Sequence, residues 1–254
     1  MAMTKPKRIG IIGGMGSRAG MELFRKLIEY SPALNDQEFP EILLHSNSCI
    51  PDRTQAIVYR KESPLAELSR SVQLLNKSNP DLIAMACVTS YYYHQEVQKL
   101  TSAYVVSPVT VTAEYIRSHY PDIRLVGLLA TTGTIQSGLF AKTFAEHDLD
   151  LVVLDPEDQE QLFMTSVYMK NGLKSAAISD EARDLLLKGA QRLKEYGAQL
   201  LVGGCSEVQL VIRNSVFGLP YVDAMDLMAR EMTRLVYSTG EIKVSESNIL
   251  TEKL

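Results

Sequence analysis

The sequence contains few cysteines and no long apolar run. Its three cysteines, Cys49, Cys87 and Cys205, are too few and too scattered for a disulfide framework. No CxxC pair and no Cys/His spacing typical of zinc sites occurs, so no metal site is predicted. No run approaches the roughly 18 apolar residues that a membrane-spanning helix needs. These absences predict a cytoplasmic protein with reduced thiols and no membrane partner.

The sequence also lacks an excess of charge of one sign. Its 26 Lys and Arg residues face 30 Asp and Glu residues, which gives a net charge of −4 and an isoelectric point near 5.7. This balance gives no electrostatic reason to expect a nucleic-acid partner. The basic start, residues 1–8, leads directly into an apolar strand, so no secretory signal region is predicted.

Two pairs of similar segments indicate that the chain consists of two related halves. Residues 81–90 resemble residues 199–207, and residues 8–14 resemble residues 124–130 at nearly the same offset. In the first pair, each apolar run of strand length ends in a cysteine with a hydroxyl residue close behind it. Buried parallel strands have this pattern, and α/β sheets bind ligands at the carboxyl ends of their strands. A cleft between the halves would set two thiols facing each other.

The whole chain alternates strand and helix patterns that are joined by short loops. Strands are predicted at residues 8–14, 41–46, 81–86, 104–106, 124–130, 151–154, 199–204 and 219–222. Helices are predicted at residues 18–30, 63–75, 161–170 and 181–196, and also from 91, up to 146, after 207 and from 226. We therefore predict an α/β fold with two pseudo-symmetric lobes, each a mostly parallel sheet flanked by helices, and the active site in the cleft between them.

The predicted lobes divide the chain unequally. The first lobe comprises residues 1–108 and 221–254, and it carries Cys87. The second lobe comprises residues 109–220 and carries Cys205. With 46% hydrophobic residues, a chain of 254 residues can bury the cores of two such domains. The polar end, residues 240–254, is predicted to be loosely attached.

The glycine-rich turn after the first strand has two interpretations. Residues 14–19 (GMGSRA) fit the GxGxxG/A pattern of dinucleotide sites, but the second strand ends in Ser46-Asn47-Ser48 and lacks the acidic residue that binds a ribose. A nicotinamide or flavin site is therefore not favoured. Backbone N–H groups at the start of a helix still suit an anion such as a carboxylate, and the alternative is a tight turn alone.

The three cysteines are interpreted differently because of their positions. Cys49 is expected to be a small buried hydrophobic residue. Cys87 and Cys205 each end a strand just before a helix, where the helix dipole and the donors Thr89 and Ser206 favour thiolate over thiol. Their equivalent places in a duplicated architecture predict that both are reactive.

Five short segments together carry a resemblance to a known family. They are residues 12–16 (IGGMG), 50–54 (IPDRT), 87–89 (CVT), 128–134 (LLATTGT) and 204–207 (GCSE). Over about residues 8–235, the sequence resembles the aspartate/glutamate racemase superfamily, which includes hydantoin racemases, maleate isomerases and arylmalonate decarboxylases. The resemblance implies an amino-acid racemase that needs no pyridoxal phosphate or other cofactor, uses two cysteines as acid and base on opposite faces of Cα, and forms a homodimer.

The sequence departs from the family's motifs in two places and lacks a further feature. The first cysteine motif is usually Cys-Asn-Thr, and Val88 removes an amide that would help to fix the substrate. The second is usually Cys-Thr-Glu, and Ser206 keeps the hydroxyl group. Aspartate-specific members also carry a basic residue in the second lobe, but the corresponding residues 155–163 include no Lys or Arg. The substrate side chain therefore stays open among Asp, Glu and others.

Racemisation requires a proton to leave one face of Cα and another to arrive on the opposite face. One thiolate and one thiol on opposite sides can do this, so Cys87 and Cys205 are the expected catalytic pair. The site must also disperse the charge that develops on the substrate. The candidates for binding its carboxylate are the backbone of Met15, Gly16 and Ser17, and the side chains of Arg53 and Thr54.

Several of these candidates have alternative roles. Arg53 suits a planar carboxylate, but it can instead form a structural ion pair with Asp52. The hydroxyl groups either bind carboxylate, orient the thiols or cap helices; they belong to Thr89, Thr131, Thr134 and Ser206. Glu207 either assists Cys205 or pairs structurally.

Two other functions are compatible with the same residues. An isomerase or decarboxylase of the superfamily would use one cysteine covalently or as a proton donor. A binding protein on the two-lobed scaffold would bind a small carboxylate without converting it.

Overall fold

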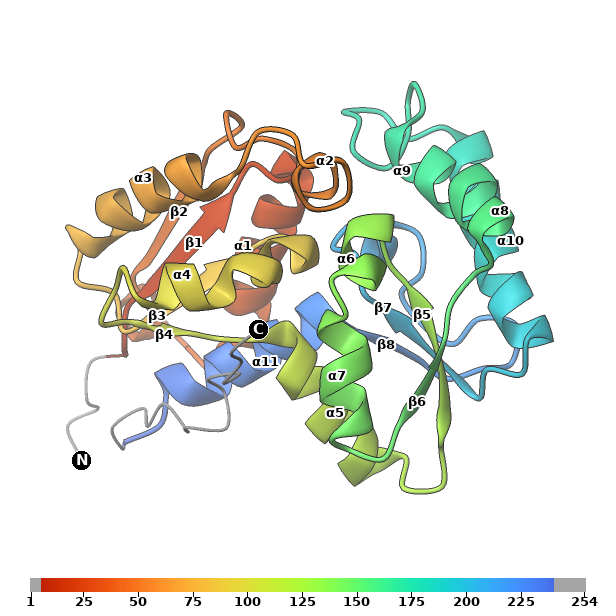
Figure 1. The fold of residues 1–254 in the computed structure, drawn as a ribbon. Coiled ribbons are helices and arrows are strands. Elements are labelled where there is room, and N and C mark those ends of the chain that lie inside the picture. Colours follow the sequence, from red (N-terminus) through yellow and green to blue (C-terminus); the bar gives the residue numbers. More distant parts are fainter. Residues whose placement is uncertain (1–5, 240–254) are drawn as a thin grey trace.

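Two four-stranded parallel sheets form the framework of the computed structural model, which describes residues 6–239 (Figure 1). The first sheet has the order β2 (Ile42–Ser46), β1 (Ile9–Gly13), β3 (Leu82–Met85) and β4 (Tyr104–Val105). The second has the order β6 (Asp150–Val152), β5 (Leu125–Leu129), β7 (Leu200–Gly203) and β8 (Tyr221–Asp223). The strand order is the same in both sheets, which confirms the predicted α/β fold with two pseudo-symmetric lobes.

The central strands of both sheets are buried on both faces. All five residues of β1 and all four residues of β3 are buried, as are those of β7. Continuous apolar runs are expected where helices cover both faces of a parallel sheet. The runs 9–13, 82–85 and 200–203 therefore dictate both the strands and their central places in the sheets.

Helices of the first lobe pack on both faces of its sheet. They are α1 (Ser17–Tyr30), α2 (Arg53–Tyr59), α3 (Leu65–Asn76) and α4 (His94–Gln98), with 3₁₀ turns η1 (Asp36–Glu38) and η2 (Val88–Tyr93). Helix α5 (Pro108–His119) then leads to the second lobe. Its start is encoded locally, because Ser107 is the N-cap residue and Pro108 occupies the first turn.

Helices of the second lobe repeat this arrangement around its sheet. They are α6 (Thr132–Gln136), α7 (Leu139–Ala145), α8 (Pro156–Asp158), the π-helical turn η3 (Gln159–Met164), α9 (Thr165–Tyr168), α10 (Asp180–Glu195) and the 3₁₀ turn η4 (Val208–Leu210). Helix α10 packs on β5, η3 and α9. Ser179 caps α10 by accepting a hydrogen bond from the N–H of Ala182 at 3.2 Å.

The last described helix, α11 (Ala224–Val236), returns the chain to the first lobe. It packs against α1 and α5, and Lys26 of α1 forms an ion pair with Asp226 at 2.7 Å. Strand β8 pairs with β7, so residues 221–223 belong to the second sheet rather than to the first lobe as predicted. The rest of the predicted division stays a prediction, and residues 240–254 lie outside the described residues.

Three local predictions differ from the structure. The helix predicted from residue 91 begins as the 3₁₀ turn η2 at Val88, directly after Cys87. The helix predicted after Glu207 is the single turn η4. No helix was predicted between residues 46 and 63, yet α2 forms there, and Asp52 caps it by accepting a hydrogen bond from the N–H of Gln55 at 2.9 Å.

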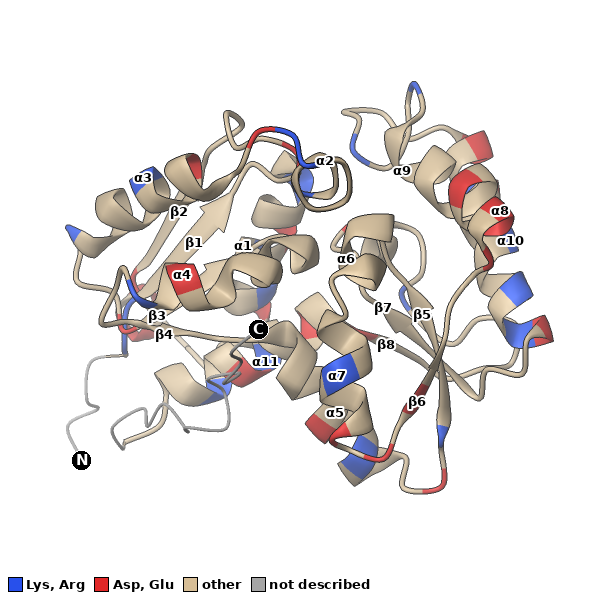
Figure 2. Cartoon of the chain, viewed as in Figure 1, with Lys and Arg blue, Asp and Glu red and all other residues tan. Residues whose placement is uncertain are grey.

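Charged residues of both signs are interspersed along the helices of both lobes (Figure 2). Many of them pair along one helix three or four residues apart, as Arg25 does with Glu22 and Arg234 with Glu231. Among the helices that the structure describes, none has the length and hydropathy that a bilayer crossing requires.

The tight contact at Gly127 of β5 gives a test of the core. A Cβ atom at this position would lie 2.7 Å from Leu201 Cδ2 and 2.9 Å from Ala198 Cβ. Gly127→Ala should therefore lower the free energy of unfolding by about 1–3 kcal/mol through overpacking. Urea denaturation measures this change.

Gly189→Ala on α10 is the matched control. Its Cβ would approach Leu154 Cδ1 only to 3.3 Å, and alanine favours a helix more than glycine does by about 1 kcal/mol. We expect its unfolding free energy to equal or exceed the wild-type value. A Gly127→Ala protein as stable as the control would contradict the proposed packing.

Candidate active site

The two cysteines of the duplicated motif occupy equivalent places in the two lobes. Cys87 lies two residues beyond β3, and Cys205 lies two residues beyond β7. Both side chains are buried, with 5% and 4% of their surface exposed. Cys49 is exposed, so the prediction of a buried Cys49 was wrong. Its polar loop, residues 47–52, keeps it at the surface.

Cys87 has the buried guanidinium of Arg53 beside it. Arg53 begins α2, and its Nη2 donates to the Met15 carbonyl at 2.9 Å while its Nη1 donates to the Pro51 carbonyl at 2.9 Å. Burial opposes the charge on Arg53, but attraction to Cys87 and to Asp52 outweighs it and raises the pKa of Arg53. Arg53 is thus the positively charged neighbour of Cys87.

Besides capping α2, the carboxylate of Asp52 contacts two residues of the second lobe. Its Oδ2 accepts a hydrogen bond from the hydroxyl of Tyr168 at 2.9 Å and lies 3.6 Å from Lys174 Nζ. Among the ion pairs of the described residues, none joins Asp52 to Arg53. The alternative of a structural ion pair between these neighbours is therefore not found.

Cys205 has a carboxylate beside it instead of a cation. Its Sγ donates to Oε2 of Glu207 at 3.1 Å, and the hydroxyl of Ser206 donates to the same oxygen at 3.0 Å. Burial raises the pKa of Cys205 well above its ordinary value, and the charge of Glu207 raises it further. The expectation that Cys205 favours the thiolate was therefore wrong. Only the short turn η4 follows Cys205, so the expected helix dipole is missing, and Ser206 donates its hydrogen bond to Glu207.

Lys174 is a basic residue of the site that sequence reasoning missed. It lies in the loop between α9 and α10, and its Nζ is 4.5 Å from the centre of the Tyr168 ring. Burial opposes its charge, but attraction to Glu207, Tyr168 and Cys87 outweighs burial and raises the pKa of Lys174. Its charge also acts on Cys205, so one ammonium group is within electrostatic range of both thiols.

Residues 155–163, where the family resemblance led us to look for a basic residue, do not supply it. Lys174 lies eleven positions further along, after the π-helical turn η3 and α9. No local sequence signal distinguishes it from Lys170, which is exposed. Only the path of the loop identifies Lys174 as part of the site.

Three of the predicted threonines form one hydrogen-bonded group between the lobes. Thr89 Oγ1 lies 2.9 Å from Oγ1 of both Thr131 and Thr134, which are 3.2 Å from each other. Thr131 is also the N-cap residue of α6, so its alternative role as a cap is found too. Thr54 packs against Gly133, where a Cβ atom would lie 2.9 Å from its Cα.

The glycine-rich turn brings the start of α1 to the second lobe. Gly16 is the N-cap residue of α1, and a Cβ atom there would lie 2.8 Å from Glu207 Oε1. Met15 is buried and offers its carbonyl to Arg53, whereas Ser17 is exposed. The amino end of α1 therefore faces the carboxylate of Glu207.

Two buried polar atoms of this site lack a hydrogen-bond partner within residues 6–239. They are Arg53 Nε, a donor, and Glu207 Oε1, an acceptor. Val88, next to Cys87, is buried and adds no polar group to the site. The structure thus places two thiols, a positively charged hydrogen-bond donor and a negatively charged hydrogen-bond acceptor near the contact of the lobes. A zwitterionic ligand could bind both charged groups.

Comparisons with known proteins find similar sequences and structures over most of the chain. The profile of the Asp/Glu/Hydantoin racemase family matches residues 12–232. The broad specificity amino-acid racemase RacX of Bacillus subtilis (strain 168) is 23% identical over 238 residues, which cover 91% of this chain and 100% of RacX.

Solved structures show the same fold. The aspartate racemase of Picrophilus torridus has a TM-score of 0.78 at 24% identity, covering 90% of this chain and 94% of its own. The glutamate racemase RacE1 of Bacillus anthracis has a TM-score of 0.66 at 17% identity, covering 95% and 85%. The chain belongs to the Asp/Glu/hydantoin racemase family and is an isomerase of the racemase class.

Proposed function

We propose that the protein racemises an amino acid without a cofactor, with Cys87 and Cys205 acting on opposite faces of Cα. The observation that carries this proposal is the opposite electrostatic environment of the two thiols. Arg53 places a positive charge beside Cys87, whereas burial and the charge of Glu207 raise the pKa of Cys205. One thiolate and one thiol are the starting states that a two-base racemisation needs.

The proposed reaction moves one proton at each face. The Cys87 thiolate removes the Cα proton, and the electron pair of the C–H bond passes into the α-carboxylate. The Cys205 thiol then gives its proton to the other face of Cα, which leaves Cys205 as thiolate and Cys87 as thiol. The reverse reaction begins from this exchanged state.

The two charged groups on Cα of the substrate require partners of opposite sign. Arg53 Nε and the backbone N–H groups at the start of α1 would bind the α-carboxylate and stabilise the charge that develops there. Glu207 Oε1 would accept a hydrogen bond from the α-ammonium group. Both atoms lack partners among the described side chains, so an amino acid would satisfy both.

Lys174 supports an acidic side chain in the substrate. Its ammonium group is held at the contact of the lobes by Asp52 and Tyr168, in range of both thiols. A second carboxylate of the substrate could replace Asp52 as its partner. The names of relatives include both aspartate racemase and broad specificity amino-acid racemase, and Lys174 favours an aspartate- or glutamate-like substrate here. The homodimer and the cytoplasmic location stay predictions.

Solvent exchange tests the two-cysteine reaction. In D₂O the wild-type protein should bring deuterium into Cα of both enantiomers of aspartate or glutamate, as read by proton NMR and chiral chromatography. Cys87→Ser and Cys205→Ser should each lower racemisation by at least about 10³-fold, because each removes the acid and base of one face. Cys49→Ser, a change at the exposed cysteine, should leave the rate unchanged.

Other outcomes identify the alternatives. Substantial turnover after the loss of one cysteine would indicate an isomerase or decarboxylase that uses a single thiol. Binding without deuterium exchange would indicate a binding protein. Either result would reject the two-cysteine racemase.

Glu207→Gln tests the state of Cys205. The negative charge of Glu207 raises the pKa of Cys205 in addition to burial, so its removal should lower that pKa and increase the thiolate fraction at pH 8. Alkylation of Cys205 by iodoacetamide, followed by mass spectrometry, should become about tenfold faster. Glu195→Gln, at an exposed position of α10, is the control, and an unchanged or slower rate in Glu207→Gln would contradict the assignment.

Lys174→Gln tests the recognition of an acidic side chain. Loss of the ammonium group should lower kcat/KM for aspartate or glutamate by about 10²-fold while affecting alanine much less, because one charge-assisted contact contributes roughly 1.5–3 kcal/mol. Lys170→Gln, four residues earlier and exposed, should behave as wild type. Equal losses for acidic and neutral substrates would show that Lys174 does not select the side chain.

A further inference from the structure

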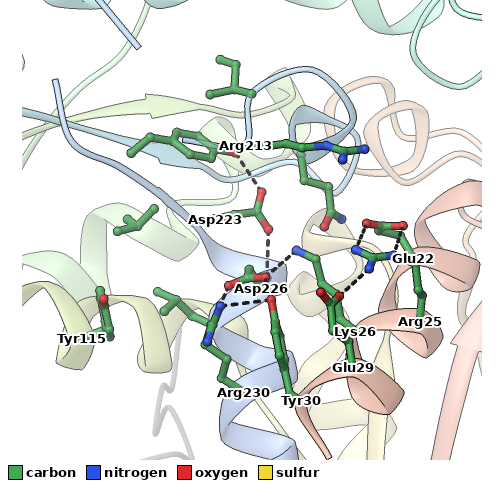
Figure 3. A pocket seen from close by; sticks show the side chains of 15 residues that line it. Glu22, Arg25, Lys26, Glu29, Tyr30, Tyr115, Arg213, Asp223, Asp226 and Arg230 are labelled. Carbon is green, nitrogen blue, oxygen red and sulfur yellow. Dashed lines mark hydrogen bonds and ion pairs between the residues drawn. The ribbon is translucent and has the colours of Figure 1, made fainter. Parts of the chain in front are cut away.

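A second polar cavity lies where the two lobes and α11 meet. It has a volume of about 540 Å³, and its walls come from α1, α5, the turn η4 with its following loop, β8 and α11 (Figure 3). Neither Cys87 nor Cys205 lines it. We call this space the junction cavity.

Most of the charges in the junction cavity neutralise each other. Arg25 pairs with Glu22 and with Glu29 along α1. Lys26 and Arg230 both pair with Asp226, at 2.7 and 2.8 Å. These charged groups therefore already have partners within the protein.

Arg213 also lines the cavity, but it takes part in none of these ion pairs. It lies in the loop after η4 and is exposed, and Figure 3 shows it on the other side of the cavity from Asp226 and Arg230. Within residues 6–239, no ion pair or side-chain hydrogen bond involves Arg213, and its attraction to Glu22 acts over a longer distance. Its guanidinium is available to an anionic group such as a carboxylate.

Gln209 supplies an unsatisfied acceptor to the same cavity. Its side chain is 5% exposed, and its Oε1 has no hydrogen-bond partner among the described residues. The orientation of the amide is fixed, because Nε2 donates to the Ser206 carbonyl at 2.8 Å. A buried carbonyl oxygen without a donor is unfavourable, and a hydrogen bond from a ligand N–H group would remove this cost.

Asp223 adds a second acceptor nearby. Its Oδ1 accepts a hydrogen bond from the N–H of Asp226 at 2.9 Å, and its Oδ2 accepts one from the hydroxyl of Tyr221 at 2.9 Å. Each carboxylate oxygen can accept a further hydrogen bond. The cavity thus offers two acceptors and the guanidinium of Arg213, which together match a ligand with an ammonium group and a carboxylate.

The acceptor wall of the cavity is connected to Cys205. Gln209 Nε2 holds the carbonyl of Ser206, and the Ser206 hydroxyl shares Glu207 Oε2 with the thiol of Cys205. A ligand that forms a hydrogen bond with the amide of Gln209 can therefore shift residues 206–207, which orient this thiol.

We propose that the junction cavity binds a small zwitterion of the α-amino-acid class, a free amino acid or a short peptide, and transmits its presence to Cys205 through Gln209. The ammonium group binds Gln209 Oε1 and Asp223, and the carboxylate binds Arg213. The volume accommodates either source of this chemistry, so the experiment includes one probe for each.

Calorimetry with the full chain tests the binding. Glycine, which cannot be racemised, probes the free amino acid, and glycylglycine probes the peptide. One of the two probes should bind. Arg213→Gln should raise the Kd of this probe at the junction cavity at least about tenfold, whereas Arg192→Gln, at an exposed position of α10, should leave that Kd unchanged. Methylammonium and acetate, which carry one charged group each, should bind at least about tenfold more weakly than the probe.

Several results would overturn the proposal. They are the binding of neither probe, an affinity that Arg213→Gln leaves unchanged, and equal binding of acetate alone. Because calorimetry does not depend on turnover, this outcome is separate from that of the proposed racemase activity.

Kinetics tests the connection to Cys205. At saturating substrate the bound probe should change the kcat of the wild-type protein at least about twofold, and Arg213→Gln, with its basal kcat retained, should not respond. An increase in KM alone would place the probe at the cysteine site and would reject the coupling.

Discussion

The contact between the lobes depends on a buried group of threonine hydroxyls and on a more exposed polar contact, each of which joins residues of opposite lobes. Thr89 bonds to Thr131 and Thr134, and Asp52 accepts from Tyr168. A buried polar group without a partner is costly, so these contacts favour one relative position of the two sheets. The same position brings Gly16 against Glu207 and Lys174 into range of Cys87 and Cys205.

The two thiols show how a duplicated fold can acquire unlike chemistry. Both follow equivalent central strands, and both are buried. The difference comes from single neighbours, because Cys87 has a guanidinium beside it and Cys205 has a carboxylate. Neighbouring charge thus gives different electrostatic surroundings to two thiols that the backbone places symmetrically.

Much of the fold is predictable from the sequence because its signals are local. The apolar runs at 9–13, 82–85 and 200–203 dictate central parallel strands, and their repetition predicts two lobes of the same topology. The predicted site residues on the turns after β1, β3, β5 and β7 come together for the same reason. Carboxyl ends of parallel strands share one edge of a sheet.

Other features depend on contacts between distant segments and could not be predicted. The protonated state of Cys205 follows from burial together with Glu207, and the role of Lys174 follows from the course of a loop. The turn after residue 207 lacks the length of a helix, which removes the dipole that the sequence pattern led us to expect. Strand β8 joins the second sheet through its pairing with β7, and no local pattern states that pairing.

Within the described residues, the main chain passes between the lobes only twice, from the first to the second through α5 and back through the step from β8 to α11. A rigid-body rotation of the lobes about these two links would leave every strand ladder intact. Its free-energy cost would come from the polar bonds across the contact, each contributing roughly 0.5–1.5 kcal/mol, and from the apolar side chains of both lobes that pack in one continuous buried cluster. Such a rotation would open a path for a small molecule to the buried sulfurs while the strands of both sheets stay paired.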